Sequence, residues 1–257
     1  ILLLAEKLLT SLIKKRQLNS CPDIPARYLA ESRQYINGPA EIKNNFLARR
    51  AWLEISLEQL RLNTQALLNA LPPHCGLMAV VKADAYGLGA VPVSQFLNQM
   101  GVDSFAVSTI DEGISLRRHG IKGEILILGY TDIARARELK RYKLTQTAID
   151  YPYALALNNA GFGLKVHAAI DTGMKRLGIQ PQNKEELLAL FKLPRLKVTG
   201  VYSHLCDSFS REKESLEFTK EQIDRFNQML DYLKRSGIKL PPAHLCLLYT
   251  SPSPRDA

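Results

Sequence analysis

The stretch Ala79-Val80-Val81-Lys82-Ala83-Asp84-Ala85-Tyr86-Gly87-Leu88-Gly89 decides how the rest of the chain is interpreted. Its apolar start predicts a buried β-strand, and the small residues and glycines after it predict a tight turn. Lys82 ends the strand, where an amine is costly to place unless it has a role or extends to water. A desolvated strand-end lysine can form a Schiff base with an aldehyde such as pyridoxal phosphate (PLP). From this stretch alone, a surface lysine and a Schiff-base lysine are both open interpretations.

An alternation of apolar runs and helical segments continues along the chain. Near-continuous apolar strands separated by amphipathic helices are typical of a parallel sheet covered on both faces. We therefore predict an α/β fold, a (β/α)8 TIM barrel truncated before its last strand, with two open edges. An open doubly wound sheet is the rival, weakened by the lack of a G-x-G-x-x-G motif after the first strand. The predicted strands are Leu77–Lys82, Ser104–Ser108, Glu124–Leu128, Leu144–Ile149, Leu164–Ile170, Val198–His204 and Ala243–Cys246.

Three side chains near strand ends complete a candidate site at the carboxyl end of the barrel. Tyr86 lies in the turn after Lys82, and its hydroxyl can donate to a phosphate. Arg176 follows a strand in Asp171-Thr172-Gly173-Met174-Lys175-Arg176-Leu177-Gly178 and can pair with an anionic oxygen. His204 ends the run Gly200-Val201-Tyr202-Ser203-His204 and can stack on an aromatic ring. The alternatives are a loop-capping arginine and a hydrogen-bonded core histidine.

In their order and spacing, these segments resemble the alanine racemase family of PLP enzymes, which interconvert L- and D-alanine. The resemblance covers about residues 50–246. It implies that Lys82 bonds covalently to PLP and is the base on the D-face of the substrate, and that Tyr86 binds the cofactor phosphate. It also implies that Arg176 contacts the cofactor oxygen and orients the substrate, and that His204 packs against the pyridine ring. The implied intact enzyme is a homodimer acting on a small amino acid, and D-alanine serves cell-wall synthesis.

The chain departs from the family pattern at several positions. Ala169 stands where many members have a lysine that supports the arginine, and Leu88 stands where histidine is common. The family's C-terminal β domain, which supplies the opposite-face tyrosine base from the partner subunit, is absent after Cys246. We therefore expect little racemase activity from these 257 residues alone.

The two ends of the chain differ from the barrel segment. We expect residues 1–16 to form an amphipathic or membrane-proximal helix, residues 17–50 a linker, residues 51–246 the barrel, and residues 247–257 a non-native tail. The apolar first segment is followed by Lys14-Lys15-Arg16, as expected at the cytoplasmic end of a membrane span. This pattern resembles the membrane-fused serine/alanine racemase subgroup. The expected location is the cytoplasm or the cytoplasmic face of a membrane.

Composition and residue spacing argue against several other classes of function. The net charge is +9, but the basic residues are scattered and match no nucleic-acid motif, so no nucleic-acid partner is expected. The four cysteines have no zinc-site spacing and are expected to be reduced, and no metal site is predicted. Two other functions stay open, a non-catalytic PLP-binding barrel protein and a metal-dependent barrel hydrolase. The hydrolase is disfavoured because no paired histidines follow the first strand.

Overall fold

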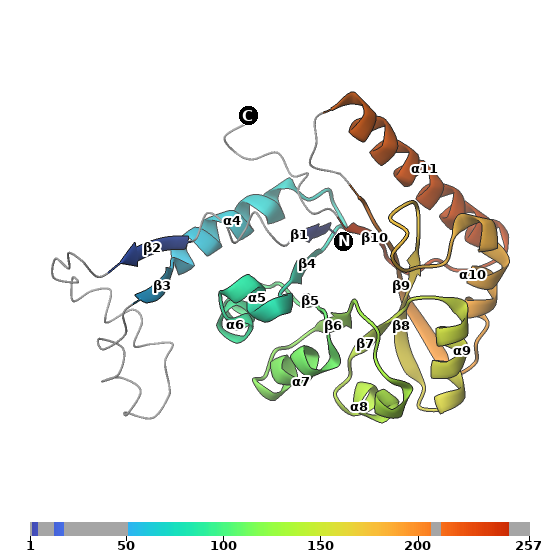
Figure 1. Cartoon of the computed structure of the whole chain (residues 1–257), viewed down its shortest axis with the longest axis horizontal. Helices are drawn as coiled ribbons and strands as arrows, with labels where there is room; N and C mark the ends of the chain where they lie inside the picture. Colours follow the sequence, from blue (N-terminus) through green and yellow to red (C-terminus); the bar gives the residue numbers. More distant parts are fainter. Residues whose placement is uncertain (1, 5–12, 18–50, 207–211, 247–257) are drawn as a thin grey trace.

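The computed structural model describes residues 2–4, 13–17, 51–206 and 212–246. Its main body is a closed barrel in the strand order β1-β10-β9-β8-β7-β6-β5-β4, with every neighbouring pair parallel. The helices lie around the outside (Figure 1). The barrel strands are β1 (Leu2–Leu4), β4 (Leu77–Val80), β5 (Ser104–Val107), β6 (Glu124–Ile127), β7 (Thr145–Ala148), β8 (Leu164–Ile170), β9 (Leu196–His204) and β10 (Ala243–Cys246).

The predicted α/β barrel is confirmed, since the seven predicted strands correspond to β4 through β10 with ends that differ by up to two residues. α-Helical or 3-10 segments connect most of them. These segments are α5 (Lys82–Gly87), α6 (Ala90–Gln99), α7 (Ile110–Arg118), η1 (Ile133–Arg135), α8 (Ala136–Arg141), α9 (Tyr151–Ala160), η2 (Pro181–Asn183), α10 (Lys184–Phe191) and α11 (Lys213–Arg235).

The structure of the first described residues differs from two expectations. Instead of a helix over residues 1–16, Leu2–Leu4 forms a strand between β4 and β10, so the expected open edges are paired. Ile13–Gln17 forms β2, which pairs antiparallel with β3 (Ala51–Ile55). A run of three leucines lacks the polar residues that would fix a helical period, and it suits a barrel strand equally well. Residues 18–50 of the expected linker over residues 17–50, and the expected tail over 247–257, lie outside the described residues.

Helix α4 (Leu57–Ala70) joins the β2–β3 pair to the barrel (Figure 1). Its start follows the sequence, because the Ser56 hydroxyl accepts a hydrogen bond of 3.1 Å from the Gln59 backbone N–H. Leu60 on this helix is buried in the main apolar cluster, which lies between the strands and the surrounding helices. The barrel and its helices therefore share one core.

The barrel contains a small apolar cluster and a group of hydrogen-bonded polar side chains. Met78, Val80, Ala106 and Leu126 form a separate inner cluster on β4, β5 and β6, and the half-buried Tyr86 packs against it. In the polar group, His167 Nδ1 lies 3.0 Å from His244 Nε2, and His167 Nε2 lies 3.3 Å from Glu124 Oε1. Burial, and secondarily the neighbouring His167, hold the pKa of His244 well below its usual range. This polar layer ties β6, β8 and β10 together.

Candidate active site

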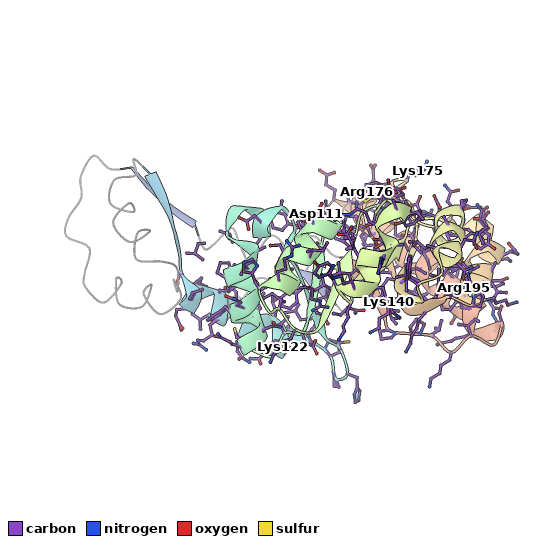
Figure 2. All side chains as sticks on the ribbon, turned by 90° about the horizontal axis from the view of Figure 1, so that it is seen from below. Asp111, Lys122, Lys140, Lys175, Arg176 and Arg195 are labelled. Atoms are coloured by element: carbon purple, nitrogen blue, oxygen red, sulfur yellow. The ribbon has the colours of Figure 1, made fainter. Side chains whose placement is uncertain are left out.

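The carboxyl ends of the parallel strands lie at one end of the barrel, where the predicted site residues are found. In Figure 2, Asp111, Lys175 and Arg176 lie toward the upper edge, and each follows the carboxyl end of a strand. Lys122, Lys140 and Arg195 precede strands and lie toward the opposite edge. The view therefore separates the candidate site from the amino end of the barrel.

Lys82 begins an unusual turn two residues after β4. The four residues Ala83–Tyr86 all have left-handed backbone angles, with φ between 50° and 56° and ψ between 35° and 49°. For residues with a Cβ, this conformation costs roughly 1–2 kcal/mol each, so the fold must hold it in place. The Lys82 Nζ lies 6.0 Å from the centroid of the Tyr86 ring. The turn thus places the predicted lysine and tyrosine next to each other at the barrel opening.

Two carboxylates hold this turn. Asp84 Oδ1 accepts a 2.7 Å hydrogen bond from the Ala90 backbone N–H, which connects the turn to the start of α6. Glu112 Oε1 accepts a 2.7 Å hydrogen bond from the Ala83 backbone N–H. Gly89 has a φ of 91°, and a Cβ there would lie 2.9 Å from the Pro92 ring, so glycine is required. The local backbone is therefore fixed by both side-chain acceptors and a glycine.

Arg176 lies on the loop between β8 and η2. Asp171 Oδ1 accepts hydrogen bonds from the backbone N–H groups of Gly173 at 3.0 Å and Lys175 at 2.9 Å, which closes the loop on itself. The Arg176 side chain is exposed. Arg225 Nη1 on α11 donates to the Thr172 carbonyl at 2.8 Å, so the helix also fixes the start of this loop.

His204 at the end of β9 is half-buried, and the charges of Arg176 and Lys82 act on it. Burial, and to a smaller extent the positive charges of Arg176 and Lys82, together lower the pKa of His204 to about 4. Both side chains are thus close enough to act on the imidazole. The structure brings Lys82, Arg176 and His204 together at one end of the barrel, with Tyr86 beside Lys82.

Two residues that support the site were not predicted from the sequence. Glu112 belongs to a capping box with Thr109, a T-x-x-E pattern that is visible in the sequence but indicates a helix start. Gln222 is fully buried on α11 and accepts from the Cys206 N–H at 3.0 Å. Its amide also donates to Thr172 Oγ1 at 3.3 Å and the His204 carbonyl at 3.4 Å. The available signal for Gln222 is a polar residue within the apolar stripe of a helix.

A separate cavity of about 550 Å³ lies among residues at the amino ends of β6, β7 and β8. Arg117 lines it, but its guanidinium donates to four backbone carbonyls, those of Tyr142, Ile121, Gly123 and Lys143. This arginine therefore holds loops together. The cavity is lined by Arg117, Lys122, Gly123, Glu124, Arg141, Tyr142, Lys143, Thr145 and Lys165, and none of the predicted site residues contributes to it.

A family model described as "Alanine racemase, N-terminal domain" matches residues 55–247, which include the barrel strands β4 to β10 and the four predicted site residues. The chain belongs to this family. The alanine racemase relationship extends to solved structures, since alanine racemase from Clostridium difficile matches with a TM-score of 0.68 and 34% identity. That match covers 72% of this chain and 52% of the solved chain.

Curated relatives carry racemase names. An amino-acid racemase from Enterococcus faecalis is 46% identical over 211 residues, which are 82% of this chain and 30% of that protein. A serine/alanine racemase from Enterococcus gallinarum is 45% identical over 197 residues, 77% of this chain and 28% of that protein. The chain thus spans less than a third of these two racemase relatives and about half of the Clostridium difficile structure.

Within the described ranges, no group of three or more His, Cys, Asp and Glu side chains is arranged to bind a metal ion. In the same part of the chain, no helix combines the length and the apolar character needed to cross a bilayer.

Proposed function

We propose that this barrel binds PLP through Lys82 and forms the cofactor-binding part of an amino-acid racemase acting on alanine or serine. The observation that carries the proposal is the convergence of Lys82, Arg176 and His204 at the carboxyl end of the barrel. Membership of the alanine racemase family and the names of the relatives support the reaction class. PLP, the substrate and the dimer are inferred for this chain from that membership.

The chemistry of the converging side chains fits PLP. A primary amine at Lys82 can bond to the aldehyde carbon in its neutral form, and the Arg176 guanidinium suits a ligand that carries phosphate and phenolate groups. The low pKa of His204 keeps its imidazole neutral at pH 7, so this ring can pack on an aromatic face without adding a third charge. Tyr86 lies beside Lys82 at the edge of the inner apolar cluster, in reach of the same ligand.

In the proposed reaction, PLP supplies an electron sink that makes the substrate Cα–H acidic. Lys82 Nζ would hold the cofactor until the substrate amine takes its place, and the lysine amine freed by that exchange would remove or return the proton on the D-face. Arg176 orients the substrate by pairing with an anionic oxygen. His204 stays neutral and fixes the plane of the ligand ring.

Racemisation needs a second base on the opposite face of the substrate. We propose that this base is the family's tyrosine from a C-terminal β domain of a partner subunit, outside these 257 residues. The intact enzyme is then a homodimer, and the present chain alone exchanges protons on one face. Attachment to the cytoplasmic face of a membrane, through a domain such as those expected in the membrane-fused subgroup, belongs to the same proposal.

Measuring hydrogen exchange at the substrate α-carbon tests directly whether Lys82 acts on the D-face alone. With PLP and D2O, the chain should replace the α-hydrogen of D-alanine by deuterium at least tenfold faster than that of L-alanine, as followed by NMR. Lys82→Ala should abolish the exchange, whereas the neighbouring Lys175→Ala should retain it. Equal exchange of both enantiomers, or exchange that survives in Lys82→Ala, would contradict the proposed role of Lys82.

A further inference from the structure

The left-handed turn next to Lys82 is anchored from outside by Glu112. Ala83–Tyr86 hold φ values between 50° and 56°, which residues with a Cβ rarely adopt, so a partner must stabilise the turn. The Ala83 backbone N–H, on the residue that follows Lys82, donates to Glu112 Oε1 at 2.7 Å. The two residues are 29 positions apart in the sequence, on the segments that follow β4 and β5.

The Glu112 carboxylate accepts hydrogen bonds from three backbone N–H groups. In addition to Ala83, Oε2 accepts from Ser108 at 2.7 Å and from Thr109 at 3.1 Å. Short bonds of this kind to an ionised acceptor are about twice as strong as neutral ones. A capping box explains the bond from Thr109 but not those from Ser108 and Ala83. These two bonds join the segments that follow the carboxyl ends of the adjacent strands β4 and β5, and one of them is made by the residue next to Lys82.

We propose that Glu112 is a positioning residue that orients the Lys82 amine for covalent bonding by fixing the left-handed turn through the Ala83 N–H. Without this acceptor, the turn can relax toward the right-handed conformation that L-residues prefer, and the Lys82 side chain then leaves the barrel opening. Glu112 acts through the backbone and does not itself contact the reacting atoms. The inference rests on the proposed function, in which Lys82 is the residue that bonds to PLP.

The test uses the full chain with Glu112→Gln and a matched control, Thr109→Ala. Glu112→Gln keeps the size of the side chain but turns one acceptor oxygen into an NH2 group that faces N–H donors. Thr109→Ala removes the hydroxyl that accepts from the Glu112 backbone N–H at 3.3 Å, yet leaves the carboxylate and its bond to Ala83 in place. Circular dichroism and thermal melting establish that each variant folds, and Glu112→Asp replaces Glu112→Gln if the latter does not.

Two quantities are measured at Lys82. The first needs no cofactor and is the rate at which trinitrobenzenesulfonate labels Lys82 across a pH series, read by mass spectrometry. The second is the PLP concentration that gives half-maximal labelling of Lys82 after borohydride reduction. For Glu112→Gln we expect the labelling rate of Lys82 to change at least threefold and the half-maximal PLP concentration to rise at least tenfold. For Thr109→Ala we expect both quantities to stay within twofold of their values in the unaltered chain.

A glycine rescue separates positioning from general stability. Glycine adopts left-handed angles without a steric penalty, so Ala83→Gly combined with Glu112→Gln should regain at least threefold of the lost PLP labelling. Unchanged labelling in Glu112→Gln, an equal loss in Thr109→Ala, or no rescue would overturn the inference. If the unaltered chain bonds no PLP at Lys82, the proposed function fails, and the cofactor-free labelling rates still decide the role of Glu112.

Discussion

His204 is kept neutral because it is half-buried and faces two positive charges. Its pKa lies near 4, below its ordinary value of 6.5, through burial and through Arg176 and Lys82. Because the unfolded chain binds this proton more readily, the neutral imidazole contributes to stability above about pH 6.5. That contribution is lost as the pH falls from 6.5 toward 4. The same neutrality is what the proposed ring contact requires.

Replacing Arg176 should raise the pKa of His204. In Arg176→Ala we expect the value to rise above 4 but stay below 6.5, because burial persists when one cation is removed. NMR titration of the histidine ring carbons measures it, and Lys175→Ala is the neighbouring control that leaves it unchanged. A His204 titration near 6.5 in the unaltered chain would contradict the described geometry.

Gln222 joins the arginine loop to the histidine strand. Gln222→Leu removes its hydrogen bonds to Thr172, His204 and Cys206 and leaves buried polar atoms without their partner. We expect the free energy of unfolding to fall by about 1–3 kcal/mol, measured by urea denaturation. The same change at the exposed Gln228, on the same helix, should alter it by less than about 0.5 kcal/mol. Equal effects at the two positions would refute this role.

At the scale of elements, the close contact between β8 and β9 requires glycine, which has no side chain, at position 200. A Cβ on Gly200 would lie 2.6 Å from two atoms of the His167 ring. The ring has little freedom to move, since it lies between Glu124 and His244. The register also shifts between Val166 and His167, which matches a local irregularity beside this contact.

Gly200→Ala should therefore destabilise the barrel by about 1–3 kcal/mol, the usual cost of overpacking. Gly76→Ala provides the control, because a Cβ at that position meets nothing within 4 Å, and it should change stability by less than about 0.5 kcal/mol. Chemical denaturation of the two variants side by side gives the comparison. A Gly200→Ala chain as stable as Gly76→Ala would show that His167 can move aside.

The elements that the sequence predicted well are those with strong local patterns. Leu164–Ile170 and Ala243–Cys246 have the same bounds in the structure as in the prediction, because apolar runs bounded by turn residues identify buried strands. The left-handed turn after Val81 could not be predicted beyond a tight turn. Its conformation depends on the Ala83 bond to Glu112, a tertiary contact that local residue preferences do not contain.

At the scale of the whole molecule, the alternation of strands and helices was enough to predict the barrel, and the carboxyl ends of its strands are where we propose the site. Lys82, Arg176 and His204 could be chosen because chemically distinctive side chains follow strand ends. Glu112 and Gln222 were missed because they act by accepting and donating backbone hydrogen bonds. The strand Leu2–Leu4 was missed because its partners, β4 and β10, are distant in the sequence.

The most direct measurement of the central claim is the site of covalent PLP attachment. The chain is mixed with PLP, reduced with borohydride, digested and analysed by mass spectrometry, alongside Lys82→Ala and Lys175→Ala. The account predicts one dominant modified lysine, Lys82, retained in Lys175→Ala and lost in Lys82→Ala. Modification spread evenly over the surface lysines, or an unchanged level in Lys82→Ala, would contradict it.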